Sequence, residues 1–348
     1  MFLEYLKEHA TIKYQKTTQM LTDSHNRKHT YLRISLTERC NLRCTYCMPA
    51  EGIHPSPKSQ LMTFEEIYAI AKTFVAHGVT KIRLTGGEPF VRKDVHLVLE
   101  KLATLPVELA ITTNAATAHN HIDTLKACHI NNINVSLDSL SSKKFKAISR
   151  YDCFEKVYNN ILLLVAQGFK LKINVVLIKG VNDDEIIDFI NLTKTLPVTV
   201  RFIEFMPFDG NRWDLSKMVS QNAILDRVHN SFVNDKILRL KDAANDTSKN
   251  YKIKEYQGSF AIISSVTNPF CDSCNRIRLT ANGCLKNCLF SADELDLLTP
   301  LRDGKPIENI IENAMRLKAK IRGGMDTIEK LKSPELHTNN RSMIAIGG

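Results

Sequence analysis

The feature that most constrains the fold of this chain is a regular alternation of strand-like and helix-like segments between residues 31 and 207. The strand-like runs, from YLRISL to VRFIEF, are rich in β-branched residues. Such an alternation predicts a parallel sheet with right-handed crossovers, either doubly wound or curved into an incomplete (β/α) barrel. The expected strands cover residues 31–36, 81–86, 108–114, 132–138, 172–178 and 200–205. The expected helices cover residues 63–77, 93–104, 119–128, 142–149, 154–167 and 183–195.

Polar residues, glycines or cysteines follow five of these strands at their C-terminal ends. Taken singly, such residues often do no more than form turns. The C-terminal edge of the strands is, however, where barrel enzymes build their active sites. Five such segments together therefore indicate a site at this edge, and they lie at residues 40–47, 86–89, 112–114, 136–138 and 204–207.

The pattern changes after Pro207, and a length of 348 residues also favours two domains. A helix is expected near 219–230, and strand-like runs at 251–256 and 259–266 precede a group of cysteines. We therefore expect an N-terminal extension over residues 1–25, a partial barrel over 26–235, and a smaller C-terminal domain over 236–348.

The composition limits the classes of function. No apolar run approaches the roughly 18–20 residues that cross a bilayer, so no membrane association is expected. The formal charge of +10 is spread along the chain rather than gathered in one stripe, which disfavours nucleic-acid binding. Nine cysteines in a long chain without an export signal indicate metal-bound or buried thiols and a cytoplasmic location.

Three cysteines stand in C-x3-C-x2-C spacing at positions 40, 44 and 47. A zinc site would need a fourth ligand, for which His54 is the nearby nitrogen donor. A four-iron cluster normally takes four cysteines, so three would leave one iron open to a small molecule. Buried or redox-active thiols are the third possibility. The spacing favours the cluster with an open iron.

A second group consists of Cys271, Cys274, Cys284 and Cys288. Two pairs of thiols are compatible with a structural zinc knuckle. If only Cys271, Cys274 and Cys288 bind, the result is a second cluster with an open iron, and Cys284 is a bystander or an alternative ligand. The two other cysteines, at positions 128 and 153, are expected to be small buried side chains.

The stretch CNLRCTYCMP at residues 40–49 resembles the CxxxCxxC motif of the radical S-adenosylmethionine (SAM) superfamily, which has an aromatic residue before its last cysteine. GGEP at residues 86–89 matches a second element of that superfamily. From about residue 22 to 348, the chain resembles the molybdenum cofactor biosynthesis protein A family of GTP 3′,8-cyclases. The motifs that carry this resemblance are RISLTERCNLRC, RLTGGEP, TTN, INVSLD, RFIEFMP, CDSCNRIRLTANG, CLF and the terminal Gly347-Gly348.

The resemblance implies an incomplete (β/α)6 TIM-type barrel whose open side is closed by the smaller C-terminal domain. It implies a radical SAM lyase that converts GTP to (8S)-3′,8-cyclo-7,8-dihydroguanosine 5′-triphosphate, the first step of molybdenum cofactor biosynthesis. A 5′-deoxyadenosyl radical would abstract the C3′ hydrogen of GTP, and C3′ would attack guanine C8. The [4Fe-4S] cluster that chelates SAM would be bound by Cys40, Cys44 and Cys47. A second [4Fe-4S] cluster, against the guanine, would be bound by Cys271, Cys274 and Cys288.

The resemblance also assigns binding and catalytic residues. SAM would be contacted by Tyr46, Gly87, Ser136 and Met206. GTP would be held by Arg33, Arg83, Thr112, Lys172, Arg276 and Arg278, and a triphosphate needs such cations. The residues expected to support catalysis are Arg276, Arg278, Gly347 and Gly348. Because Arg276 and Arg278 are two residues apart, they would face the same way on a strand.

The chain departs from the family at Cys284, where a cysteine is unusual, and at Ala115, which replaces the usual glycine of TTNG and is expected to stiffen the loop. Two alternatives remain: a peptide-modifying radical SAM enzyme with an auxiliary cluster, and a non-enzymatic iron–sulfur or zinc protein that binds nucleic acid. The first predicts more C-terminal cysteines and no Arg-x-Arg after CxxC. The expected partners are GTP, an electron donor, cyclic pyranopterin monophosphate synthase as the next enzyme, and a second copy in a homodimer.

Overall fold

The computed structural model of the chain describes residues 20–49, 51–333, 336 and 340–347. Its strands are β1 (Tyr31–Ser35), β2 (Lys81–Thr85), β3 (Glu108–Thr113), β4 (Asn132–Ser136), β5 (Lys170–Leu177), β6 (Thr199–Glu204), β7 (Ile237–Arg239), β8 (Lys249–Ile253), β9 (Ser259–Ile263), β10 (Arg276–Leu279), β11 (Cys284–Lys286) and β12 (Leu295–Asp296). Its α-helices are α2 (Phe64–Ala76), α3 (Val95–Ala103), α4 (Ile122–Ala127), α5 (Ser142–Ser149), α6 (Phe154–Ala166), α7 (Ile186–Leu192), α8 (Gln221–Ser231), α9 (Leu298–Arg302), α10 (Glu308–Arg316), α11 (Ile328–Lys332) and α13 (Met343–Ile346).

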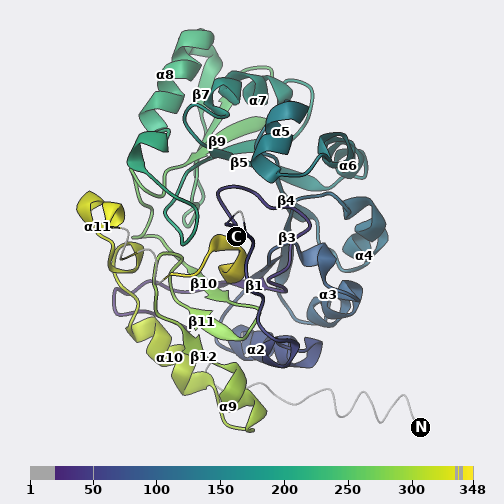
Figure 1. Cartoon of the computed structure of the whole chain (residues 1–348), viewed down its shortest axis with the longest axis vertical. Coiled ribbons are helices and arrows are strands. Elements are labelled where there is room, and N and C mark those ends of the chain that lie inside the picture. The colour runs from purple at the N-terminus through teal and green to yellow at the C-terminus, as the bar shows by residue number, and fades with distance from the viewer. Residues whose placement is uncertain (1–19, 50, 334–335, 337–339, 348) are drawn as a thin grey trace.

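The six expected strands of the N-terminal part are confirmed, and β1 to β6 pair in parallel in chain order. The sheet curves around a central space, and α2 to α7 lie along its outer side (Figure 1). This arrangement is the incomplete (β/α)6 barrel, because a doubly wound sheet would carry helices on both faces. The apolar sides of these helices and strands form one continuous core outside the barrel wall.

The C-terminal part extends the same sheet at both of its edges. Strand β10 pairs in parallel with β1, and β9 pairs in parallel with β6. Antiparallel β11 and β12 follow beyond β10, and β8 and β7 follow beyond β9, so the whole forms one twelve-stranded sheet. Strands from one segment of the chain therefore flank the barrel on both sides of its opening (Figure 1).

Local sequence signals explain where several elements begin. Thr63 accepts a hydrogen bond from the backbone N–H of Glu66, and Glu66 caps Thr63 in return, which starts α2 with a capping box. Ala115 has a left-handed backbone with a φ of 60°, a conformation that favours glycine. Its carbonyl accepts a hydrogen bond from the side chain of Asn160 at 2.7 Å, which helps to hold the loop after β3.

Residues 20–30 pack against the barrel and the C-terminal part. Thr22 and Lys28 form an antiparallel bridge, and Leu21 is buried in the core. The guanidinium of Arg27 donates to the carbonyls of Cys271 at 2.9 Å, Ala319 at 2.9 Å and Lys320 at 2.8 Å. Residues 21–25, which the sequence placed in an extension, are thus part of the fold, while residues 1–19 lie outside the described part.

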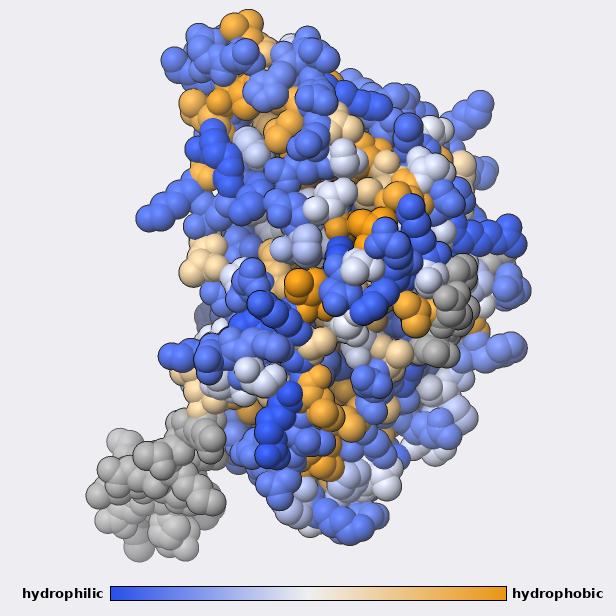
Figure 2. Space-filling model, turned by 90° about the vertical axis from the view of Figure 1, so that its left-hand side faces the viewer, coloured by the Kyte–Doolittle hydropathy of each residue, from blue (hydrophilic) through white to orange (hydrophobic). Residues whose placement is uncertain are grey.

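In the part of the chain that the structure describes, no helix combines the length and the apolar character that crossing a membrane requires. Figure 2 shows the side on which α8 and α11 lie, which carries mainly hydrophilic residues with small hydrophobic patches between them. Scattered apolar residues of this kind are normal on protein surfaces.

Candidate active site

Two rows of polar side chains cross the inner face of the barrel on β10, β1 and β2. Arg276, Tyr31 and Lys81 occupy one set of register positions. Two residues further along, Arg278, Arg33 and Arg83 occupy the next set. Side chains two residues apart on a strand point to the same face, so both rows face the interior of the barrel. The expectation that Arg276 and Arg278 face the same way is confirmed.

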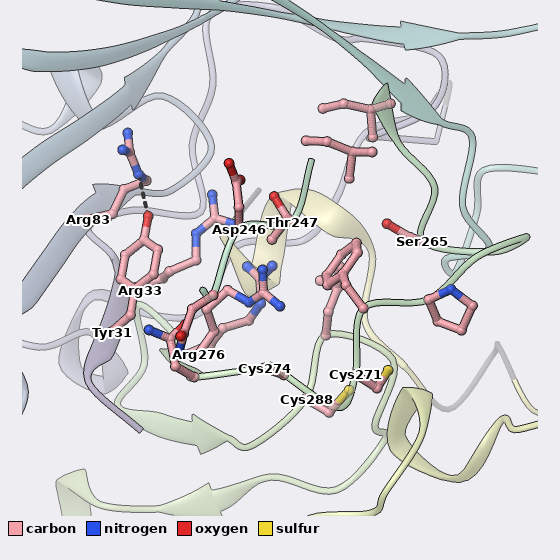
Figure 3. A pocket seen from close by; sticks show the side chains of 18 of the residues that line it. Tyr31, Arg33, Arg83, Asp246, Thr247, Ser265, Cys271, Cys274, Arg276 and Cys288 are labelled. Carbon is pink, nitrogen blue, oxygen red and sulfur yellow. Dashed lines mark hydrogen bonds between the residues drawn. The ribbon is translucent and has the colours of Figure 1, made fainter. Parts of the chain in front are cut away.

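These rows form one wall of a cavity of about 460 Å³. Lys172, Asn174 and Arg201 on β5 and β6 form the opposite wall, and both Arg201 Nε and Nη2 donate to Asn174 Oδ1, at 3.0 and 2.7 Å. Figure 3 shows Tyr31, Arg33 and Arg83 at one end of the cavity and the cysteines at the other. Of the residues expected at the site, the cavity is lined by Arg33, Arg83, Lys172, Met206, Cys271, Cys274, Arg276, Arg278 and Cys288.

The cavity is strongly electropositive. Burial and neighbouring cations lower the pKa of Arg201 to about 9, and burial lowers the pKa of Arg33 to about 10. Burial alone would raise the pKa of Tyr31, but the charges of Arg83 and Arg33 outweigh it and lower this pKa to about 8. These pKa shifts arise because several cations lie close together and out of water. A polyanionic ligand would offset the repulsion between these cations. Among the described residues that line the cavity, the only carboxylate is Asp246.

Three cysteines of the second group, Cys271, Cys274 and Cys288, line the cavity at the end away from Tyr31 (Figure 3). The backbone N–H of Arg322 donates to Cys271 Sγ at 3.4 Å. Burial would raise the pKa of the Cys274 thiol, but Arg276 and Lys318 outweigh it and lower this pKa to about 6. A thiol with such a pKa is largely a thiolate at neutral pH, which is the form that binds metals.

Cys284 lies apart from these three thiols. It is on β11, opposite Asp296 of β12, and it is not among the residues that line the cavity. Burial and the charge of Glu294 raise the pKa of its thiol, and the nearby Arg341 lowers it by a smaller amount. The structure therefore gives Cys284 different neighbours from Cys271, Cys274 and Cys288.

The first group, Cys40, Cys44 and Cys47, lies on the loop that follows β1. The N–H groups of Cys47 and Met48 both donate to the carbonyl of Cys44 at 3.0 Å, which folds the loop into a turn around the thiols. Cys40 Sγ accepts hydrogen bonds from the N–H of Leu42 at 3.4 Å and from Asn114 Nδ2 at 3.7 Å. All three thiols are free, and burial raises their pKa values, that of Cys40 to about 11.

The donor sets of both groups suit an iron–sulfur cluster in their chemistry. Within the described residues, no three His, Cys, Asp or Glu side chains come together closely enough to hold one metal ion. The thiolates of an iron–sulfur cube each bind a different iron. Three soft thiolates without a histidine or carboxylate also match the ligands that such clusters use.

The GGEP segment packs directly against the first cysteine loop. The N–H of Gly87 donates to the carbonyl of Thr37 at 2.7 Å, and the N–H of Glu88 donates to that of Arg39 at 2.9 Å. A Cβ on Gly87 would lie 2.3 Å from the Arg39 carbonyl oxygen. The glycine is therefore needed for the approach of the cysteine loop itself, whichever ligand lies beyond it.

The other residues expected to contact SAM lie on the first cysteine loop and at the ends of β4 and β6. The Tyr46 hydroxyl donates to Asp138 Oδ2 at 2.7 Å, which ties the first cysteine loop to the segment after β4. Ser136 is the last residue of β4, and Met206 follows β6 and lines the cavity. Thr112 lies beside Asn134 in register, and its buried hydroxyl has no hydrogen-bond partner in the described part, but it does not line the cavity.

The C-terminal segment packs against residues of the site. Met343, at the start of the short helix α13, lines the cavity. The carbonyl of Gly347 accepts a hydrogen bond from Arg278, and a Cβ on Gly347 would lie 2.6 Å from Thr85 Oγ1. The segment thus enters the centre of the barrel (Figure 1). Gly348, also expected at the site, lies outside the described residues.

Sequence reasoning missed several residues of the cavity: Tyr31, Lys81, Asn174, Arg201 and Asp246. A signal was available for three of them. Tyr31, Lys81 and Asn174 each lie on an expected strand, two residues from the expected site residues Arg33, Arg83 and Lys172. They therefore belong to the same inward face. Arg201 lies on an expected strand, but no expected site residue stands two positions away from it. Asp246 lies in an irregular loop between β7 and β8, where no periodicity marks it.

An incomplete parallel barrel with three thiols on the loop after its first strand defines a radical SAM enzyme, a class that uses SAM and an iron–sulfur cluster. A family model described as Radical SAM superfamily matches residues 34–193, and one described as Molybdenum Cofactor Synthesis C matches residues 198–323. The chain belongs to the GTP 3′,8-cyclase family: it is 45% identical to "GTP 3′,8-cyclase, mitochondrial" of Arabidopsis thaliana, covering 97% of this chain and 86% of the relative.

Further comparisons agree. The GTP 3′,8-cyclase of Clostridium botulinum is 38% identical over 86% of this chain and 91% of its own. Molybdenum cofactor biosynthesis protein 1 of Homo sapiens is 42% identical over 99% of this chain, which spans about half of that relative, 53%. The crystal structure of Streptococcus suis SuiB has a TM-score of 0.58 at 17% identity, covering 83% of this chain and 69% of SuiB, a likeness of fold alone.

Proposed function

We propose that this protein catalyses the 3′,8-cyclisation of GTP with SAM as the radical source, the first step of molybdenum cofactor biosynthesis. The observation that carries the proposal is the electropositive cavity that ends at Cys271, Cys274 and Cys288. Membership of the family argues against both the peptide-modifying enzyme and the nucleic-acid-binding protein, and the size of the cavity is typical of sites for small molecules.

The triphosphate is the part of GTP that the cations suit. Arg33, Arg83, Lys172 and Arg201 converge from four strands on one region, and a triphosphate carries several negative charges there. Arg276 and Arg278 lie between this region and the second group of cysteines. We assign them to the orientation of the nucleotide, so that the ribose is held near the first group and the base near the second.

Each group of thiols would hold one [4Fe-4S] cluster. The first cluster, on Cys40, Cys44 and Cys47, supplies when bound the one-electron chemistry that generates a radical from SAM. Tyr46, Gly87, Ser136 and Met206 would surround the SAM. The protein's own part is to hold the reacting carbons together and to keep water out, and α13 across the barrel mouth suits the second task.

The test is to incubate the reduced, anaerobic protein with SAM and GTP and to measure 5′-deoxyadenosine and cyclised GTP. Equal formation of 5′-deoxyadenosine with and without GTP would contradict the substrate assignment. Iron and sulfide analysis tests the number of clusters. Two clusters would give about eight irons per chain, whereas about four irons would correspond to a single cluster. The electron donor, the next enzyme, the homodimer, the cytoplasmic location and the domain boundaries stay predictions.

A further inference from the structure

We propose that Arg341 is a positioning residue that holds the C-terminal segment, residues 340–347, in the mouth of the barrel. It does so through an ionic cluster with Glu294 and Glu38, which we call the tail latch. The proposal rests on the proposed function only where it links the position of this segment to turnover. Of these three residues, only Glu38 lies within one of the motifs quoted above, RISLTERCNLRC, and none of the three is assigned a role there.

The contacts of Arg341 join three distant parts of the chain. Its Nη2 forms an ion pair with Glu294 Oε2, which lies just before β12. Its Nη1 donates to Asn282 Oδ1 at 3.1 Å and lies 3.7 Å from Glu38 Oε1. The side chains are 30% exposed for Arg341, 14% for Glu294 and 4% for Glu38, so water screens these charges only in part.

The charges within the latch balance. Glu294 Oε1 lies 3.3 Å from Nζ of Lys286, whose side chain is fully buried and whose ammonium also donates to the carbonyl of Ser291 at 2.6 Å. Two cations, Lys286 and Arg341, thus face two carboxylates, Glu294 and Glu38. Removing Arg341 leaves Glu294 with Lys286 alone and takes from the buried Glu38 its cation, which is more costly than losing an exposed ion pair.

Glu38 connects the latch to the first cysteine loop. It stands two residues before Cys40 and accepts hydrogen bonds from the N–H of Ser56 at 2.6 Å and from its hydroxyl at 3.0 Å. One end of the latch therefore lies on the loop that carries the first thiols. The other end, Glu294, lies in the C-terminal part, so Arg341 holds its segment between the two.

The segment itself has no other charged side chain. Asn340 donates to the carbonyl of Leu289 at 3.0 Å, and the rest is α13 with its buried Ile344 and Ile346. The segment then ends at Gly347, whose carbonyl accepts from Arg278 of the site. Because Arg341 lies only six residues before Gly347, a shift of the latch changes where Gly347 meets Arg278.

The experiment measures hydrogen exchange of the peptides that cover residues 340–347 in the anaerobic, cluster-loaded protein, together with kcat, KM for GTP and iron content. The variants are Arg341→Ala, Arg341→Lys and Glu294→Gln, with deletion of Gly347-Gly348 as a reference. Arg227→Ala is the matched control, because Arg227 also pairs with a mostly buried carboxylate, that of Asp183, and neither residue lines the cavity.

We expect Arg341→Ala to speed exchange in the segment about tenfold and to lower kcat about tenfold, while KM and iron content stay within about twofold. Arg341→Lys should restore part of kcat, since one cation remains, and Glu294→Gln should resemble Arg341→Ala. Arg227→Ala should change neither exchange in the segment nor kcat. A general loss of stability would instead lower iron content in Arg341→Ala.

Unchanged exchange in Arg341→Ala and Glu294→Gln would overturn the latch. Faster exchange with unchanged kcat would overturn the link between the latch and turnover. If the wild-type protein formed no cyclised GTP, the proposed function would fail, but the exchange data would still decide whether Arg341 holds the segment.

Discussion

At the scale of single residues, Asp246 is unusual because its carboxylate lines a cavity full of cations. It is held by the N–H and hydroxyl of Ser248 at 3.2 and 2.9 Å and by the side chain of Asn250 at 2.8 Å. Its charge opposes that of Lys172 and Arg201 nearby. A fixed negative charge here reduces the attraction for a triphosphate.

We therefore expect Asp246→Asn to tighten GTP binding by about 1 kcal/mol at low salt, roughly a fivefold lower dissociation constant. Calorimetric titration of the unreduced protein with GTP measures this dissociation constant. Asp226→Asn is the control, because Asp226 is exposed on α8 and should leave the constant unchanged. Weaker binding by Asp246→Asn would show instead that the carboxylate accepts a hydrogen bond from the nucleotide or binds its cation.

Cys284 is the second residue whose role is decided by its neighbours. It lies near Glu294 and Arg341 and away from the thiols at the cavity, so Cys284→Ser should keep the iron and sulfide content of the wild type. Cys288→Ser should lose about four irons per chain, because a cube normally needs its thiolate ligands. Loss of iron from Cys284→Ser would mean that the ligands of the second cluster were assigned wrongly.

At the scale of elements, the contact between the GGEP segment and the first cysteine loop depends on Gly87. A methyl group there meets the Arg39 carbonyl at 2.3 Å, and backbone hydrogen bonds prevent both segments from moving apart. Gly87→Ala should therefore displace the loop, cost about 1–3 kcal/mol of stability and remove roughly four irons per chain. Gly304→Ala is a suitable comparison, because a Cβ on Gly304 meets no atom within 4 Å and only its positive φ of 69° opposes the substitution. Full iron content in Gly87→Ala would show that the loop adapts.

The elements also show what the sequence could predict. Strands β1 to β6 were predictable because β-branched runs and amphipathic helices have different periods. The two rows of polar side chains followed only in part, since Arg33 and Arg83 were expected but Tyr31 and Lys81 were not. The positions of β9 beside β6 and of β10 beside β1 had no local signal, because pairing between segments far apart in the sequence depends on the packing of the whole chain. For the same reason, Glu38, Glu294 and Arg341 could not be connected in advance.

At the scale of the whole molecule, a buried group ties the start of the fold to its C-terminal part. Asp23 Oδ2 accepts from Arg27 Nε at 2.6 Å and lies 3.0 Å from His29 Nε2. Arg27 in turn binds carbonyls of the C-terminal part. Nδ1 of His29 is buried without a hydrogen-bond partner in the described part. A proton on this nitrogen would have no acceptor, so the folded protein favours the neutral imidazole.

Burial and the charge of Lys318 outweigh Asp23 and lower the pKa of His29 from 6.5 to about 4. Between these values the unfolded chain binds a proton that the folded protein does not, so this group makes stability fall as pH drops from 6.5 to 4, by up to roughly 3 kcal/mol. Asp23, whose pKa is lowered to about 2, contributes stability that is lost only below 3.8. The buried carboxyl of Glu88, whose pKa is raised to about 7, acts in the opposite direction, so wild-type data alone would mix the effects.

The measurement is therefore the difference in free energy of unfolding between the wild type and His29→Gln, which keeps a donor for Asp23 but does not titrate. This difference should shift in favour of the variant as pH falls from 6.5 to 4. A difference that stays constant over this range would show that His29 carries its proton in the folded protein.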